Sequence, residues 1–309
     1  MSAREEKIMR LSLLTRAAWE EGLPPPLSKA AFARMLAGRM IEGLVLRSGI
    51  DEESPQLQCA RLLLGRCRRV AECLEAYERR GYEMILPEDP AWPKGLLRIG
   101  KGMPQFLFLR GKSALLAQRR IALAGSREIA VQTRRLAEAA GRAIASEGYA
   151  MVCGGARGVD DAAQQALLAR GGSLILVPAM PVETLLGRNA YLREALEDGR
   201  LLIACDALPD EPFSAAKALA RNHTIYALGD AALVVASRNG VGGSWRGATD
   251  CLREGYAPLG AFDGEHEDLA GNRALHVLGA AHVCRDRPIV PQLMRASVRQ
   301  TDLFTAMEG

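Results

Sequence analysis

Short apolar runs alternate with helical patterns between residues 119 and 283. The runs are long enough for buried strands and too short for helices, and they span residues 121–124, 149–152, 174–177, 201–205, 232–236 and 257–261. Segments with helical spacing of apolar residues separate them, including 214–228 and 244–254. This alternation predicts an α/β fold with a doubly wound, mostly parallel sheet.

The pattern before residue 80 is helical. Ile8, Leu11 and Leu14 begin one apolar stripe, and the prolines at 24–26 break the chain after it. Ser28 is placed to cap a helix that runs through about Met40. Residues 61–80 have the pattern of one amphipathic helix, and its polar face is either solvated or a surface for DNA or a partner. That face carries Arg61, Arg66, Arg68, Arg69, Arg79 and Arg80. We therefore expect a small helical domain over residues 1–80.

Two further segments flank the predicted sheet domain of residues 119–283. Prolines punctuate residues 81–118, which we expect to form an extended bridge with a strand at 105–109, joining the sheet domain. Residues 284–309 are polar with scattered apolar side chains, so they form either a docking helix or a loose C-terminal tail.

Two glycine turns fall where a predicted strand ends and a helix begins. They supply the first candidate binding residues: Gly125, Ser126, Arg127, Gly154, Gly155, Arg157 and Gly158. The carboxyl ends of parallel strands share one edge of a sheet, so both turns are expected there. Glycine lets a ligand approach the backbone, and the first N–H groups of a helix favour an anion. With Arg127 and Arg157 beside them, the pair of turns predicts a phosphate site. Gly243 and Ser244 precede a further helix and extend this prediction, with Ser244 as its N-cap.

The glycine turns do not match the common nucleotide motifs. Residues 154–158 have neither the G-x-G-x-x-G spacing nor the G-x-x-x-x-G-K-[ST] pattern. No nucleophile with a base and an orienting residue is visible, and Asp160 and Asp161 are placed to cap and charge the start of their helix. We therefore expect a binding protein that is not an enzyme and needs no cofactor.

Composition narrows the setting. No apolar run reaches the length of a membrane span, and residues 1–10 are charged, unlike a secretory signal. The seven cysteines form no C-x-x-C pair, which favours free thiols in a reducing cytoplasm and gives no indication of a metal site. The net charge of +4 does not by itself indicate nucleic acid.

Several segments resemble motifs of the DprA/Smf family of DNA-processing proteins. GSR at 125–127 follows a predicted strand, and CGGARGVDDAAQ at 153–164 is similar to the family's SG-x-A-x-GID-x-x-AH. Residues 221–225 resemble RNR-x-I, residues 241–248 resemble SGS-x-x-TA, and residues 271–280 resemble G-x-N-x-L-I-x-x-GA. The motifs stand in the right order from about 100 to 283, so the resemblance is specific.

The resemblance implies a Rossmann-like DprA domain that binds single-stranded DNA through its phosphates. It also implies a non-enzymatic role in loading a recombinase, and a homodimer. It adds Asn189, Arg221 and Asn222 to the candidate binding residues. Trp245 and Tyr226 are the aromatic side chains near the motifs that are candidates for stacking on bases.

The chain departs from the family's motifs at five positions that we expect at the ligand edge. Cys153 replaces serine, Gln164 replaces histidine, His223 replaces arginine, Ala236 replaces glutamate and Gly247 replaces threonine. These departures keep two other functions open. One is a diverged regulator that acts on a partner protein, such as an antitoxin against a toxin in an antiviral, phage-defence module. The other is a sensor of a nucleotide-derived ligand.

Overall fold

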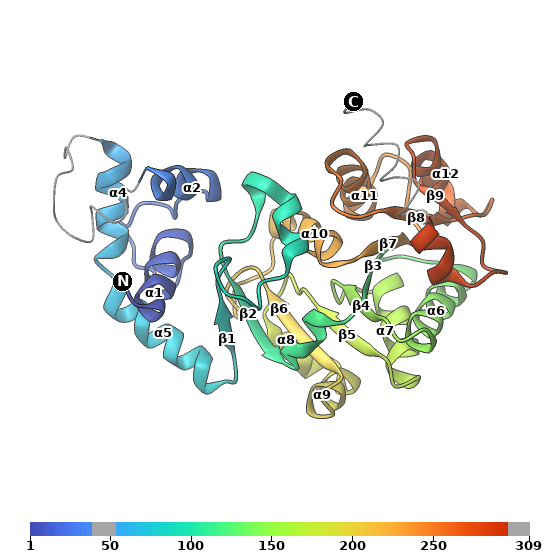
Figure 1. The fold of residues 1–309 in the computed structure, drawn as a ribbon, viewed down its shortest axis with the longest axis horizontal. Coiled ribbons are helices and arrows are strands. Elements are labelled where there is room, and N and C mark those ends of the chain that lie inside the picture. Colours follow the sequence, from blue (N-terminus) through green and yellow to red (C-terminus); the bar gives the residue numbers. More distant parts are fainter. Residues whose placement is uncertain (39–53, 296–309) are drawn as a thin grey trace. The chain divides into compact units, whose positions relative to one another are not determined.

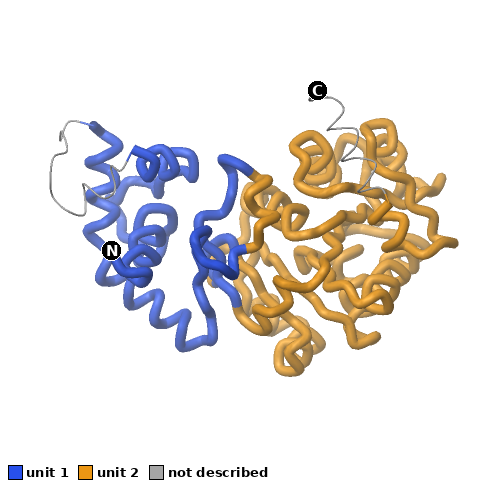
Figure 2. Tube along the Cα trace, viewed as in Figure 1, with its two compact units in different colours: residues 1–92, 100–109, 206–209 blue, residues 93–99, 110–205, 210–309 orange. Residues whose placement is uncertain are grey.

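Residues 1–38 and 54–295 are described by the structure, which is a computed structural model (Figure 1). The described chain divides into two units (Figure 2). Unit 1 contains residues 1–92, 100–109 and 206–209, and unit 2 contains the rest. Among the described helices, none is long and apolar enough to cross a membrane.

Unit 2 is built on a parallel sheet whose strands lie in the order β6-β5-β4-β3-β7-β8-β9 (Figure 1). The strands are β3 (Arg120–Ala124), β4 (Ala150–Cys153), β5 (Ser173–Leu176), β6 (Leu201–Cys205), β7 (Ala231–Val234), β8 (Leu259–Phe262) and β9 (Ala281–Val283). Every residue of β4, β6, β7 and β8 is buried, as expected for strands covered on both faces. The chain runs from β3 outward to β6 and then returns to β7 beside β3, so the strand order reverses between β3 and β7.

Helices connect the strands and cover the sheet. They are α6 (Val131–Ser146), α7 (Val159–Ala169), α8 (Val182–Arg188), α9 (Ala190–Glu197), α10 (Ala215–Leu228), α11 (Gly242–Glu254) and α12 (Ala270–Val277). The short 3-10 helices are η1 (Lys94–Gly102), η2 (Ser113–Ala117) and η3 (Glu267–Leu269). Crossovers in two directions from the reversal place helices on both faces. The predicted doubly wound α/β fold is confirmed.

Unit 1 is mainly helical. It contains α1 (Ala3–Leu14), α2 (Lys29–Ala37), α4 (Pro55–Leu64) and α5 (Cys67–Arg79), together with β1 (Glu83–Ile85), which pairs antiparallel with β2 (Leu107–Gly111). Met9, Phe32, Met35 and Leu63 are the larger members of its helical core. Ser28 accepts a hydrogen bond from the Ala31 N–H and caps α2, as predicted. Met40, the expected end of that helix, lies outside the described residues.

The prediction of a single helix over residues 61–80 is wrong. The chain there forms two helices, α4 and α5, joined through Gly65 and Arg66. Arg66 was expected on the polar face, but its side chain is only 1% exposed. Its guanidinium donates to the backbone carbonyls of Ala17 and Thr15, at 2.7 Å each, and to that of Ser12. Burial lowers the pKa of Arg66. The buried guanidinium thus holds together the backbone of the turn that follows α1.

Two details of unit 2 also differ from the sequence pattern. Strand β9 was not predicted, because only three residues form it at the edge of the sheet. The start of the C-terminal segment docks on the sheet domain: Ile289, Val290 and Leu293 are buried. The rest of that segment, residues 296–309, lies outside the described chain.

Candidate nucleic-acid interface

A cavity of about 420 Å³ lies at the point where the strand order reverses. It is lined by the turn after β3, by one side of α10, and by the loop that leads from β7 into α11. Figure 1 shows β3 and β7 side by side. Residues that follow both strands line this cavity. Open parallel sheets bind their ligands in the crevice at such a reversal.

The first glycine turn is held from three directions. The Ser126 N–H donates to the Ala236 carbonyl at 2.9 Å, and the Ser126 hydroxyl reaches the same oxygen at 3.3 Å. The Gly125 carbonyl accepts from the Ser244 hydroxyl at 2.6 Å. A Cβ on Gly125 would lie 2.4 Å from Cγ2 of Val159, so only glycine lets α7 approach this closely. These contacts fix the backbone of the turn, which forms part of the cavity lining.

The second glycine turn is filled by a carboxylate of the protein itself. Oδ2 of Asp160, in the first turn of α7, accepts from the N–H groups of Gly154 at 3.0 Å and Ala156 at 3.2 Å. Gly155 and Gly158 adopt φ values of 68° and 83°, which bend the turn around that carboxylate. Burial raises the pKa of Asp160, and the charge of Arg221 partly offsets this. The N–H group of Gly154, a predicted binding residue, is thus engaged within the fold, as is that of Ala156.

Arg221 joins the second turn to the cavity. Its side chain lies over Gly154, where an added Cβ would come within 1.5 Å of Nη1, and Nη1 donates to the Val177 carbonyl at 2.8 Å. The residue is 7% exposed and lines the cavity next to Asp160. Arg221 therefore has a structural role, since it holds the Val177 carbonyl beside the second turn. Its contact with a ligand stays a prediction.

The N-terminus of α6 is also engaged. Asp268, from η3, accepts from the Ala130 N–H at 2.8 Å and from the Thr133 hydroxyl at 2.6 Å. Burial raises the pKa of Asp268, but the hydrogen bonds from Thr133 and Ala130 outweigh it, and the net shift is downward. A carboxylate of the protein itself therefore already complements the dipole of this helix.

The N-terminus of α11 borders the cavity instead. This helix starts at Gly242, and its N-cap residue, Val241, has no side-chain capping bond. Gly242, Gly243 and Ser244 all line the cavity. The prediction that Ser244 caps the helix is wrong, because the helix begins two residues earlier and the Ser244 hydroxyl donates to Gly125. Asn222 donates to the Gly243 carbonyl at 3.2 Å and fixes this end of the helix.

Cationic and aromatic side chains meet at the cavity. Arg127, Arg221 and Arg238 line it, against two carboxylates, Glu128 and Asp160. The Arg127 guanidinium carbon lies 5.8 Å from the ring centroid of Phe213, whose side chain is 50% exposed. An exposed ring beside a cation is the arrangement on which bases of a single strand stack. Phe213 was not among the predicted residues, since a single phenylalanine in a loop gives no pattern.

Other predicted residues lie outside this cavity's lining. Arg157 is exposed on the second turn, and Asn189 ends α8, where it donates to the Leu185 carbonyl at 2.8 Å. Tyr226 is 1% exposed, so its predicted role in stacking on bases is wrong. Trp245 is half-buried on α11.

The five departures from the family motifs are not part of the cavity lining either. Two of them contact each other in the interior: the Cys153 thiol donates to Oε1 of Gln164 at 3.8 Å. The Gln164 amide in turn donates to the Tyr191 hydroxyl, which donates to Asp161 at 3.0 Å. His223 contacts Asp250 at 3.2 Å. Cys153 ends β4 and Ala236 follows β7, so these two departures lie at the carboxyl edge of the sheet without lining the cavity.

Comparisons with known sequences agree on one protein family. The sequence model of the family described as DNA recombination-mediator protein A matches residues 83–293, more than half of the chain. A protein described as "Putative DNA processing protein DprA", from two strains of Mycobacterium tuberculosis, is 28% identical over 226 residues. That alignment covers 69% of this chain and 57% of the relative, so the chain spans less than two thirds of the relative's length.

Comparison with solved structures shows the same fold. DNA processing protein A (DprA) from Streptococcus pneumoniae superposes with a TM-score of 0.71 at 21% identity, covering 95% of this chain and 98% of that one. DNA processing protein A from Helicobacter pylori, described for its single-stranded DNA binding mode, superposes with a TM-score of 0.54 at 23% identity. It covers 65% of this chain and 90% of its own. The chain belongs to the DNA recombination-mediator protein A family.

Proposed function

We propose that this protein binds single-stranded DNA at the cavity between β3 and β7. The observation that carries the proposal is the grouping there of Arg127, Arg238 and the start of α11 with the exposed ring of Phe213. A helix N-terminus and arginines suit a phosphate, and an aromatic face suits a base. The Helicobacter pylori relative is described as binding single-stranded DNA, which supports the same substrate class here.

The proposed binding mode uses phosphates for affinity and stacking for the preference for single strands. A phosphate would lie at the N–H groups of Gly242 and Gly243, within reach of an arginine from the β3 turn. One base would stack on Phe213, which a duplex cannot offer without unpairing. Such contacts carry little sequence information, so binding is expected to be sensitive to salt and nearly independent of sequence.

The proposed role is binding rather than catalysis. Both serine hydroxyls in the lining donate to backbone carbonyls, Ser126 to Ala236 and Ser244 to Gly125, so neither is presented to a base. The described lining contains no histidine and no cysteine. A mediator of recombination that holds single strands for a recombinase needs no chemical step, and we extend the proposal to that role. Arg157, Asn189 and Arg221 remain proposed contacts with the DNA. We also propose that the protein forms a homodimer, which light scattering tests.

The test is binding of a labelled oligonucleotide to the full chain, single-stranded against duplex, over a series of salt concentrations. We expect tighter binding of the single strand and an affinity that falls steadily with salt. Unlabelled mononucleotides should compete only weakly, because one phosphate and one base make few of the contacts. Strong competition by a mononucleotide would favour the sensor of a nucleotide-derived ligand, which the size of the cavity also fits. No binding of any nucleic acid would favour a regulator that acts on a partner protein.

A further inference from the structure

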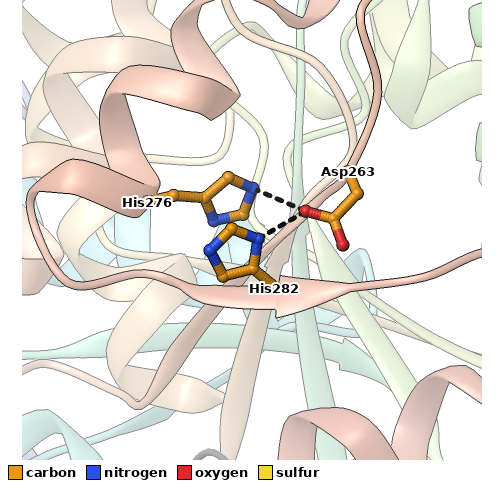
Figure 3. A group of neighbouring side chains, drawn as sticks. All are labelled: Asp263, His276 and His282. Carbon is orange, nitrogen blue, oxygen red and sulfur yellow. Dashed lines mark hydrogen bonds and ion pairs between the residues drawn. The ribbon is translucent and has the colours of Figure 1, made fainter.

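A cluster of three side chains lies in unit 2 at the end of α12 and strand β9, away from the lining of the β3–β7 cavity. His276 is in the last turn of α12, His282 is in β9, and Asp263 directly follows β8. Each offers one ligand atom, and these atoms lie within 4.8 Å of one another. Figure 3 shows the carboxylate facing both imidazole rings.

His276 supplies a buried nitrogen aimed into the cluster. Its side chain is 8% exposed. Nδ1 lies 3.2 Å from the carbonyl oxygen of Ala280, which can only accept, so Nδ1 carries the proton of the neutral ring. Among the residues that the structure describes, Nε2 then carries a lone pair and has no hydrogen-bond partner, although Oδ1 of Asp263 lies 3.3 Å away. A lone pair that faces a carboxylate is repelled by it, and a cation bound to both groups would remove that repulsion.

The bond from Nδ1 to the Ala280 carbonyl is also the usual support of a metal-binding histidine. Ligating imidazoles donate their other N–H to a carbonyl or carboxylate, which fixes the tautomer and the ring orientation. Asp263 has comparable support. The Cys284 thiol donates a hydrogen bond to its Oδ2 at 3.5 Å. The contact turns Oδ1 toward the two histidines.

We propose that His276 Nε2, His282 Nδ1 and Asp263 Oδ1 form a binding site for a divalent zinc ion. Two imidazoles and one carboxylate are a ligand set that zinc accepts with an open fourth position, whereas magnesium and calcium prefer oxygen ligands alone. Zinc–nitrogen bonds of about 2.0–2.1 Å in tetrahedral geometry place ligand atoms roughly 3.3 Å apart. The distance from His276 Nε2 to Asp263 Oδ1 is 3.3 Å and already fits.

His282 completes the site by a small movement. Its Nδ1 lies 2.6 Å from Asp263 Oδ1 as a hydrogen bond, and its ring stacks on that of His276 with centroids 3.9 Å apart. To bind the ion, this ring must open from the stack and move its proton to Nε2. The side chain is 70% exposed on an edge strand, so it has room to turn, while buried His276 keeps its place. A bound ion would then link α12 to β8 and β9.

Isothermal titration of the tag-free full chain with zinc chloride tests the proposal. We expect one equivalent to bind, and magnesium chloride to give no such binding at the same concentrations. His282→Ala is the main variant, since an exposed side chain can be removed without disturbing the core. It should weaken zinc binding by about tenfold or more and abolish the rise in melting temperature that zinc gives to the unchanged protein.

His266→Ala is the matched control. His266 is an exposed histidine outside the cluster, where its Nδ1 accepts from the Asp268 N–H at 3.2 Å at the start of η3, and its removal should leave zinc binding unchanged. Zinc binding that survives unchanged in His282→Ala would overturn the proposal, because the ion would then bind elsewhere on the protein. Failure of the unchanged protein to bind zinc would overturn it as well.

Discussion

Removal of the Arg127 side chain is expected to weaken single-strand binding while leaving the fold intact. Arg127 lies in the lining of the β3–β7 cavity, its side chain is exposed, and its guanidinium lies beside Phe213. Loss of one charge-assisted phosphate contact should cost about 1–3 kcal/mol of binding free energy. That corresponds to an affinity loss of roughly 5- to 150-fold.

The salt dependence provides a second readout of the same change. Each phosphate contact contributes about 0.7 to the slope of log affinity against log salt for a single strand. Arg127→Ala should therefore flatten that slope by about 0.7, and by the same amount for oligonucleotides of different sequence. Fluorescence anisotropy of labelled oligonucleotides between about 50 and 200 mM salt measures both quantities.

Two further arginine variants make the test specific. Arg142→Ala removes a partly exposed arginine of α6 that pairs with Glu138 at 3.7 Å, and it should leave affinity and slope unchanged. Arg157→Ala, outside the lining, should weaken binding less than Arg127→Ala. Unchanged affinity and slope in folded Arg127→Ala protein would remove the DNA site from this cavity. Equal losses of affinity in all three variants would show that the effect comes from the change in net charge alone.

Three other substitutions test the stacking on Phe213, the packing of the first glycine turn and the role of the buried Arg66. Phe213→Ala should lose about 1–3 kcal/mol of single-strand affinity with little change in salt slope, whereas Phe213→Tyr should retain binding; a flattened slope or an unchanged affinity in Phe213→Ala would refute stacking. Gly125→Ala should destabilise the fold by about 1–3 kcal/mol, because the new Cβ meets the buried Val159 at 2.4 Å. Gly187→Ala is its control in thermal melts and should be neutral or slightly stabilising, because an added Cβ there would meet none of the described residues within 4 Å. Arg66→Met should lower the free energy of unfolding by at least about 2 kcal/mol, because buried carbonyls lose their donor; an unchanged urea midpoint would contradict the structural role.

Much of the fold could be predicted from local pattern. Strand β3 and its neighbours are short apolar runs because both faces of a parallel sheet are covered, and this burial is written directly into the sequence. The glycine turns at 125 and 154 mark where strands end, and parallel pairing brings those ends to one edge. Ser28 and Ser214 mark helix starts, because a capping side chain bonds the backbone three residues on.

The arrangement of the site was decided by contacts between residues far apart in the chain. Asp268 caps α6 from 138 residues beyond Ala130, and Arg66 bonds a carbonyl 49 residues before it. Phe213 gains its neighbour Arg127 only when α10 packs behind β3. The histidines at 276 and 282 meet Asp263 because α12 returns the chain to β9 beside β8. Sequence periodicity records which side of an element is buried, but it does not record which distant groups satisfy the polar atoms brought there. Those polar atoms are paired only by the tertiary structure, since their hydrogen bonds and charges act over a few ångströms of space regardless of separation along the chain.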